Sequence, residues 1–163
     1  MSFYALALCV LGLDQLSKWA VLHRVHAGPV FGDFLRITLT HNTGAAFGLF
    51  PGARTPFIIA TLLAAAGLVY AHHVLPATDR ARRIPMALIL GGSLGNLFDR
   101  VRAGRVTDFI DVGVGDWRWP TFNTADIAVV VGAVALGGRI AWDLMREHRA
   151  AAAAKSGSAT GSR

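Results

Sequence analysis

Glutamate and lysine, which normally cover the surfaces of soluble helical proteins, are almost absent from this chain of 163 residues. Nine of the ten acidic residues are Asp, and fourteen of the sixteen basic residues are Arg. Charged residues make up 16% of the chain and hydrophobic residues 53%, with a mean hydropathy of +0.46. This composition excludes a disordered chain and lies outside the range of an ordinary soluble domain.

Cysteine is also scarce, because Cys9 is the sole cysteine and excludes an intramolecular disulfide. Its apolar neighbours favour a small buried hydrophobic residue over a redox or lipid-attachment site. The net charge of +6 and pI of about 10.7 raise the question of nucleic acid. However, the basic residues flank apolar stretches and do not alternate with aromatics, so we expect lipid headgroups as partners and no nucleic acid.

Four apolar stretches dominate what is present, at residues 2–22, 57–75, 84–101 and 126–145. Each is close to the roughly 20 residues that a helix needs to cross a bilayer. The second contains no Asp, Glu, Lys or Arg, whereas the other three are interrupted by ionisable groups, which mark functional sites in membranes. The sequence predicts one membrane domain over residues 1–149, followed by a disordered cytoplasmic tail over residues 150–163.

Orientation follows from the distribution of Arg and Lys. The first apolar stretch lacks early basic residues and contains Asp14, which indicates a retained helix rather than a cleaved signal peptide. Basic residues are denser in the connection 76–83 and in the tail than in the longer loops, which predicts cytoplasmic termini. Residues 34–42 alternate in polarity, so a small extracytoplasmic β element is expected in the first long loop.

Several polar residues fall near the outer ends of the apolar stretches. Asp14 and Lys18 are spaced i, i+4 and are expected to form an ion pair, which either neutralises itself or braces a nearby site. Asn42 begins a turn-like stretch with accessible backbone at Gly44, a weak signal by itself.

The third apolar stretch ends in the sequence GGSLGNLFDR. Its glycines (Gly91, Gly92 and Gly95) allow a neighbouring helix to approach closely. Asn96 and Arg100 share one face of this helix, and Arg100 either extends to the interface or anchors a carboxylate or carbonyl group.

Carboxylates follow in the second long loop. Asp108 lies just beyond the third stretch and Asp126 opens the fourth, where a negative charge stabilises a helix N-terminus by about 0.3–1 kcal/mol. If the two converge, repulsion and burial separate their titrations. The ionised Asp then activates water against a peptide carbonyl, and the protonated Asp assists the departing amine. Asp111 and Asp116 are competing candidates, which we expect to be solvated in the loop.

Five motifs occur in order: DQLSK, NTGAAFG, GGSLGNLFDR, VTDFIDV and FNTADIA. Together they cover most of residues 14–127, and in this order the chain resembles the lipoprotein signal peptidase family, also called signal peptidase II. The resemblance implies an aspartic endopeptidase of the bacterial inner membrane. Such an enzyme removes the signal peptide from diacylglyceryl-modified prolipoproteins by cleaving before the lipidated Cys.

The resemblance also assigns roles to residues. It implies that Asp108 and Asp126 are catalytic, with Asn42, Asn96, Arg100 and Asn123 binding substrate and with Asp14, Lys18, Gly44 and Asp99 in support. The implied fold is an all-α polytopic membrane protein with four transmembrane helices, an extracytoplasmic β-cradle and a short periplasmic helix. No metal or organic cofactor is implied. Globomycin-type peptides are the implied inhibitors, and we expect a monomer. Gly48 departs from the Ser of many relatives.

Two other classes of function compete with this interpretation. A small proton-coupled transporter or channel would explain intramembrane charge, but it predicts charges near the bilayer midplane and often two equivalent halves. A non-enzymatic assembly factor would use the glycine-rich helix and leave the Asp pair unexplained.

Overall fold

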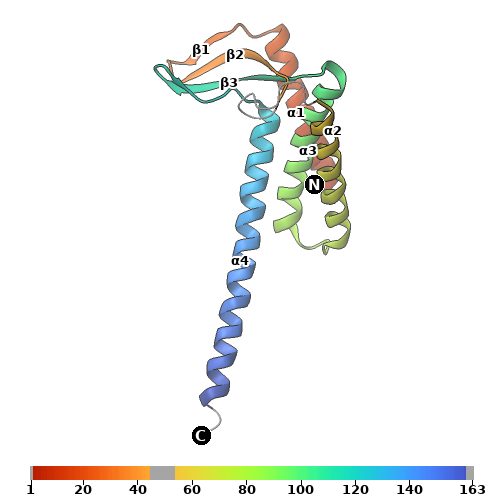
Figure 1. The fold of residues 1–163 in the computed structure, drawn as a ribbon, viewed down its shortest axis with the longest axis vertical. Helices are drawn as coiled ribbons and strands as arrows, with labels where there is room; N and C mark the ends of the chain where they lie inside the picture. Colours follow the sequence, from red (N-terminus) through yellow and green to blue (C-terminus); the bar gives the residue numbers. More distant parts are fainter. Residues whose placement is uncertain (1, 45–53, 161–163) are drawn as a thin grey trace.

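The computed structural model describes residues 2–44 and 54–160, which form a bundle of helices topped by a β-sheet (Figure 1). The helices are α1 (Phe3–His23), α2 (Arg54–Val74), α3 (Arg80–Ala103) and α4 (Thr124–Thr160). The strands are β1 (Gly28–Phe31), β2 (Leu35–Asn42), β3 (Val106–Val114) and β4 (Trp117–Arg118). They form one antiparallel sheet in the order β1-β2-β3-β4, and β2 and β3 lie across the upper end of α4.

Local capping explains where several helices begin and end. The Ser2 hydroxyl accepts a hydrogen bond from the Ala5 amide and starts α1, and the Asp79 carboxylate accepts from the Arg82 amide at the start of α3. Helix α3 ends at Gly104, whose φ of 73° is a left-handed conformation that glycine adopts without strain.

Helix α3 lies at the centre of the bundle and packs against α1, α2 and α4. A Cβ atom added at Gly91 would lie 2.5 Å from the Ala7 carbonyl oxygen of α1, and one added at Gly92 would lie 2.4 Å from the Ala125 carbonyl oxygen of α4. The predicted role of these glycines in close helix approach is therefore confirmed.

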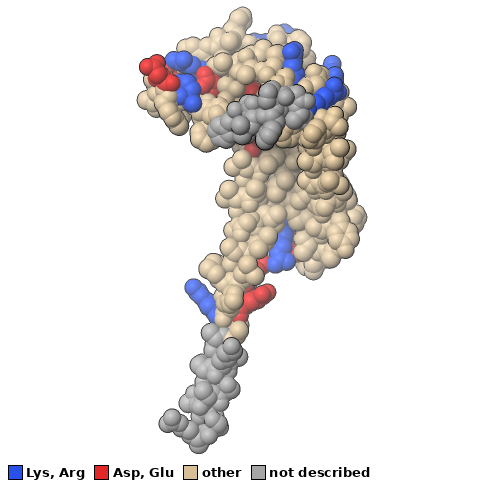
Figure 2. Space-filling view, in the orientation of Figure 1, with Lys and Arg blue, Asp and Glu red and all other residues tan. Residues whose placement is uncertain are grey.

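Three helices are long and apolar enough to cross a membrane: α1, α2 and residues Thr124–Ala151 of α4. In Figure 2 the charged side chains gather around the sheet and near the opposite end of the bundle, and an uncharged belt separates them on the face shown. The molecule is thus a helical membrane protein that carries a small sheet. Among the described residues no short helix accompanies the sheet, and residues 45–53, which include Gly48, lie outside them.

The sheet confirms the strand expected over residues 34–42, which is β2. By contrast, the second long loop is more ordered than the sequence suggested, because it contains β3 and β4. Asp111 was expected to be solvated, but it is only 8% exposed within β3. This error arose because the hydrogen bonds that form β3 come from β2, which is distant in sequence.

Two further expectations differ from the structure. Helix α4 continues to Thr160, whereas the sequence predicted a disordered tail from residue 150. The alanine run 150–154 explains the difference, because alanine has the highest intrinsic helix propensity. Cys9 was expected to be buried but is exposed on α1, since this apolar helix presents much of its surface outward.

Candidate active site

Asp108 and Asp126 line the same cavity, which has a volume of about 950 Å³. Asp108 lies on β3, opposite Thr40 of β2, and Asp126 lies in the first turn of α4. The two residues belong to different elements of the chain. The sheet crosses the N-terminus of α4 (Figure 1), which brings both residues to the same cavity. The remaining lining comes from β2, α3, α4 and the segment after β4: Thr40, His41, Asn42, Thr43, Gly44, Asn96, Arg100, Val106, Trp119, Pro120, Thr121, Phe122, Ile127, Val129, Val130 and Val131.

A reciprocal capping arrangement fixes Asp126. Its Oδ2 accepts from the Asn123 backbone amide at 3.0 Å, and the Asn123 Oδ1 accepts from the Asp126 backbone amide at 3.0 Å. This capping box starts α4 and holds the Asp126 carboxylate at the positive end of the helix. The motif FNTAD therefore encodes both the start of a helix and the orientation of a carboxylate.

Two asparagines connect the acidic pair. The Asn123 Nδ2 donates to Asp108 Oδ1 at 2.7 Å and to Asn96 Oδ1 at 3.1 Å. The Asn96 Nδ2 in turn donates to Asp126 Oδ1 at 2.8 Å. Asn42 completes the set by donating to Asp108 Oδ2 at 3.2 Å. Each of the four carboxylate oxygens thus accepts a hydrogen bond from an amide group, and no cation contacts either carboxylate among the described residues.

The surroundings of Asp108 favour its protonated form. The residue is 3% exposed, and burial followed by repulsion from Asp126 raises the pKa of Asp108 to about 6. Amide donors from Asn123 and Asn42 lower the pKa but do not cancel these two effects. A carboxyl group with this pKa can hold or release a proton near neutral pH.

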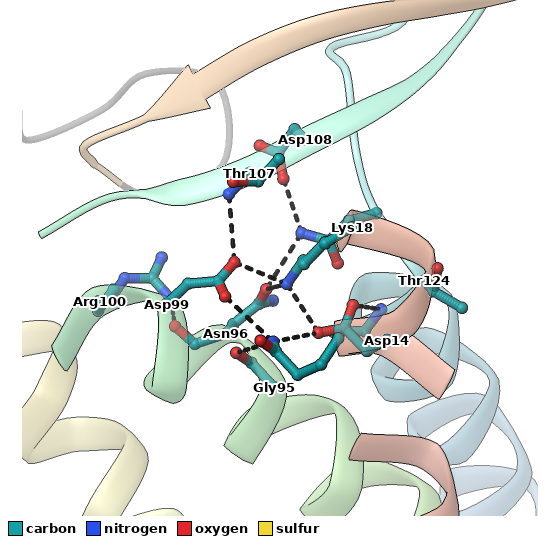
Figure 3. Close-up of polar contacts among 12 residues, drawn as sticks. Asp14, Lys18, Gly95, Asn96, Asp99, Arg100, Thr107, Asp108 and Thr124 are labelled. Carbon is teal, nitrogen blue, oxygen red and sulfur yellow. Dashed lines mark hydrogen bonds and ion pairs between the residues drawn. The ribbon is translucent and has the colours of Figure 1, made fainter. Parts of the chain in front are cut away.

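Behind the pair, Lys18 is buried between two carboxylates (Figure 3). Its Nζ lies 2.8 Å from Asp14 Oδ2, 2.8 Å from Asp99 Oδ2 and 3.2 Å from Asn96 Oδ1. An ammonium group has three donors, so Lys18 is fully satisfied. The expected ion pair with Asp14 is confirmed. Because Lys18 donates to the Asn96 Oδ1, the Asn96 Nδ2 is the atom that faces Asp126.

The two partners of Lys18 connect the helices with the sheet. Asp14 Oδ1 accepts from the Ala125 amide of α4 at 2.9 Å, and Asp99 Oδ2 accepts from the Thr107 amide of β3 at 3.2 Å. Gln15 donates to both carboxylates at 3.1 Å. Asp14, Lys18 and Asp99 therefore lie behind the cavity, where they hold α1, α3, β3 and α4 in register. Gln15 was missed from the sequence, although a polar residue beside Asp14 in an apolar helix was a signal.

Arg100 lines the cavity but contacts neither carboxylate directly. Its Nη2 donates to the Gly44 carbonyl at 3.2 Å, and its guanidinium carbon lies 5.4 Å from the centre of the Phe57 ring. The Gly44 amide donates to Asn42 Oδ1 at 2.9 Å, so Arg100 and Asn42 hold this turn from two sides. Of the alternatives drawn from the sequence, anchoring of a carbonyl describes this contact.

Asn123 is the one predicted substrate-binding residue that the structure does not place in the cavity lining. Its side chain is completely buried, because the capping box and the contacts with Asp108 and Asn96 occupy it. Asn42, Asn96 and Arg100 do line the cavity. Asp111 lies apart from the pair and accepts from Arg118, and Asp116 is exposed near the turn after β3.

Comparison with known proteins identifies this arrangement. Residues 6–142 match the family model described as signal peptidase (SPase) II. The chain belongs to the lipoprotein signal peptidase family. This family comprises aspartic endopeptidases that process prolipoproteins in bacterial membranes. The chain is 42% identical to the lipoprotein signal peptidase of Moorella thermoacetica, over 89% of this chain and 93% of that protein.

Further comparisons agree with this membership. The chain is 38% identical to the lipoprotein signal peptidase of Halalkalibacterium halodurans, over 81% of this chain and 86% of that protein. A bacterial membrane enzyme solved by the in meso method at 2.3 Å resolution has a TM-score of 0.79 and 31% identity, covering 87% of this chain and 88% of that one. The family resemblance drawn from the five motifs is thus confirmed over residues 6–142.

Proposed function

We propose that this signal peptidase II cleaves diacylglyceryl-modified prolipoproteins just before the lipidated Cys, with Asp108 and Asp126 as the catalytic pair. The observation that carries the proposal is that both carboxylates line one cavity while Asn96 and Asn123 donate hydrogen bonds to them. Each carboxylate retains access to the cavity, so a water molecule and a peptide carbonyl can meet there.

In the proposed reaction, Asp108 carries the shared proton, and Asp126, at the positive end of α4, is ionised. Asp126 accepts a proton from water as the water oxygen attacks the carbonyl carbon of the scissile peptide. Asp108 donates a hydrogen bond to the carbonyl oxygen as charge develops on it. The carbon–nitrogen bond then breaks and the proton passes from Asp126 to the amine of the lipidated Cys. The products are a signal peptide with a new carboxylic acid, which then releases its proton to solvent, and a lipoprotein with a free amine.

We assign binding and positioning roles according to which residues line the cavity. Asn42, Asn96 and Arg100 are proposed to contact the substrate backbone, whereas Asn123 positions Asp108 from behind. Gly44 supplies a backbone turn at the cavity wall, and globomycin-type peptides are proposed to occupy the same chamber.

The proposed topology places this cavity at the extracytoplasmic face of the bacterial inner membrane, with cytoplasmic termini. Helix α3 is the proposed fourth span, because its 24 residues extend about 36 Å at 1.5 Å per residue. The apolar wall formed by Ile127, Val129, Val130 and Val131 of α4 suits the diacylglyceryl group of a substrate that arrives within the membrane plane. We propose a single domain over residues 1–149 that acts as a monomer among membrane lipids.

The test uses the purified full-length chain in nanodiscs with a synthetic diacylglyceryl prolipoprotein peptide. Mass spectrometry should identify one cut, immediately before the lipidated Cys, and the same peptide without its lipid should be cleaved poorly. Cleavage at another bond, or equal cleavage of both peptides, would contradict the proposal. Proton flux across proteoliposomes without substrate cleavage would instead support a transporter.

A further inference from the structure

On the face of β3 opposite Asp108, an arginine from β4 connects β3 with the turn between β1 and β2. The Arg118 Nε and Nη2 atoms both lie 2.8 Å from Asp111 Oδ1, and Nη1 donates to the Asp33 carbonyl at 2.6 Å. Thr38 of β2 donates to Asp111 Oδ2 at 2.8 Å. We call these four residues (Arg118, Asp111, Asp33 and Thr38) the Arg118 clamp.

The clamp is largely shielded from solvent, and a glycine lies beneath the Arg118 side chain. The side chains of Arg118 and Asp111 are 21% and 11% exposed. Under the arginine lies Gly113, where an added Cβ atom would be 2.3 Å from the Trp117 carbonyl oxygen and 2.7 Å from the Arg118 Cδ. Backbone and arginine stem therefore require glycine here. Arg118 also lowers the pKa of Asp111, despite an opposing effect of burial, so the pair stays charged near neutral pH.

The clamp lies directly before one wall of the active-site cavity. Residues 119–122 line the cavity and follow Arg118 without a break. Their backbone is paired to β3, with the Trp119 amide donating to the Val112 carbonyl at 2.8 Å and the Ile110 amide donating to the Phe122 carbonyl at 2.8 Å. Strand β4 itself has only two residues. The side-chain contacts of Arg118 add to this backbone pairing at the start of the wall.

We propose that Arg118 and Asp111 are positioning residues for substrate binding, which hold the wall 119–122 at the distance from β2 and α4 that fits the substrate. This inference rests on the proposed function of the cavity. Neither residue lines the cavity, so both act through the wall that follows them.

The position of the clamp predicts which kinetic constant changes. Asn123 and Asp126 hold each other through the capping box, and Asn123 holds Asp108, so the pair does not depend on Arg118. Loss of the clamp should therefore loosen the wall and leave the chemistry nearly intact. We expect Arg118→Gln to raise KM about tenfold, the equivalent of about 1.4 kcal/mol of binding, with kcat within about twofold of the parent.

The experiment measures kcat and KM of the full-length protein in nanodiscs with the diacylglyceryl prolipoprotein peptide. The variants are Arg118→Gln, Asp111→Asn, their double variant and Gly113→Ala. The double variant should raise KM no more than Arg118→Gln alone, because Asp111 acts on the wall through Arg118. Arg118→Lys should recover only part of the parent KM, since one ammonium cannot contact both Asp111 and Asp33 as the guanidinium does. Arg105→Gln is the matched control, because Arg105 is an exposed arginine beside the start of β3 and is not part of the Arg118 clamp.

The outcome depends on which of the two constants changes, KM or kcat. A rise in KM for all clamp variants, with the Arg105 control unchanged, supports the proposal. An unchanged KM overturns it, and so does a fall in kcat alone, which would indicate only a smaller folded fraction. Asp108→Asn is measured in parallel: if that variant is active, the proposed catalytic pair fails, whereas an inactive Asp108→Asn with normal Arg118→Gln contradicts the clamp alone.

Discussion

The two faces of β3 carry aspartates three positions apart in opposite electrostatic surroundings. Asp108 faces the cavity and accepts only from amide groups, whereas Asp111 faces the guanidinium of Arg118. Both are buried, at 3% and 8% exposure. Burial and Asp126 raise the pKa of Asp108 to about 6, while Arg118 and Thr38 hold the pKa of Asp111 below its usual range against the effect of burial.

This difference shows that burial alone does not make a carboxylate suitable for proton transfer. A buried carboxylate beside a cation stays ionised and serves as a fixed contact. One that is held by neutral amides, opposite a second carboxylate, remains able to gain and lose a proton. Asp14 and Asp99 also differ from Asp108 in their contacts, because both lie against the ammonium group of Lys18.

The largest effect is expected when the amide-held carboxylates lose their charge. Asp108→Asn and Asp126→Asn should each reduce the cleavage rate by at least about 10³-fold, because neither amide can exchange a proton in the reaction. The substitution preserves side-chain shape, so circular dichroism and thermal unfolding in detergent should show a folded protein. Near-normal turnover by either variant would exclude the catalytic pair.

A cation placed beside Asp108 should make the surroundings of Asp108 resemble those of Asp111. Asn42 donates to Asp108 at 3.2 Å, and Asn42→Lys would put an ammonium group near that carboxylate. We expect a fall in kcat of about 10²-fold, because Asp108 would then lose its proton. Asn42→Ala, which removes the hydrogen bonds with Asp108 and Gly44 without adding a charge, should cost about tenfold. Equal losses in the two variants would show that charge at Asp108 is not the cause.

The pH dependence of activity should distinguish Asp108 from Asp111. Asp108 must hold a proton in the proposed reaction, so activity is present below its pKa and is lost as pH rises through it. We expect the alkaline limb of kcat/KM near pH 6, which reports the free enzyme, and the limb of kcat at higher pH once substrate excludes water. Asp111→Asn should leave the alkaline limb in place. A profile that stays flat from pH 5 to about pH 8 would contradict the assignment of the proton to this pair.

Local patterns in the sequence were sufficient for three membrane-spanning helices and for the ion pair of Asp14 with Lys18. The i, i+4 spacing of Asp14 and Lys18 and the apolar length of α2 depend on neighbours within one helix, and both predictions are confirmed. The connections of Asn96 and Asn123 with the acidic pair depend on contacts between distant segments. Spacing alone cannot predict these contacts, and only the family resemblance suggested the residues involved.

The burial of Asp111 could likewise not be predicted from its neighbours in the sequence. Its Asp-Val-Gly-Val-Gly context resembles a solvated turn, yet pairing with β2 and the contact with Arg118 bury it. Nothing in the local pattern identifies Arg118 as its partner, because arginines are common throughout this chain. A sheet that lies across a helix bundle is specified by contacts distant in sequence, whereas a membrane helix is specified locally by its composition.

The smallest effect is expected at Cys9, which supplies a baseline for all the other variants. Cys9 lies exposed on α1, within a helix apolar enough to cross a membrane, so we expect its thiol to face hydrocarbon. We expect Cys9→Ala to leave kcat and KM unchanged and to alter the unfolding free energy by less than about 0.5 kcal/mol, as is usual for exposed positions. The same assay and unfolding scan measure both. A large loss of activity would mean that the outer surface of α1 contributes to substrate processing. Residues outside β3 and the cavity would then also be needed for catalysis.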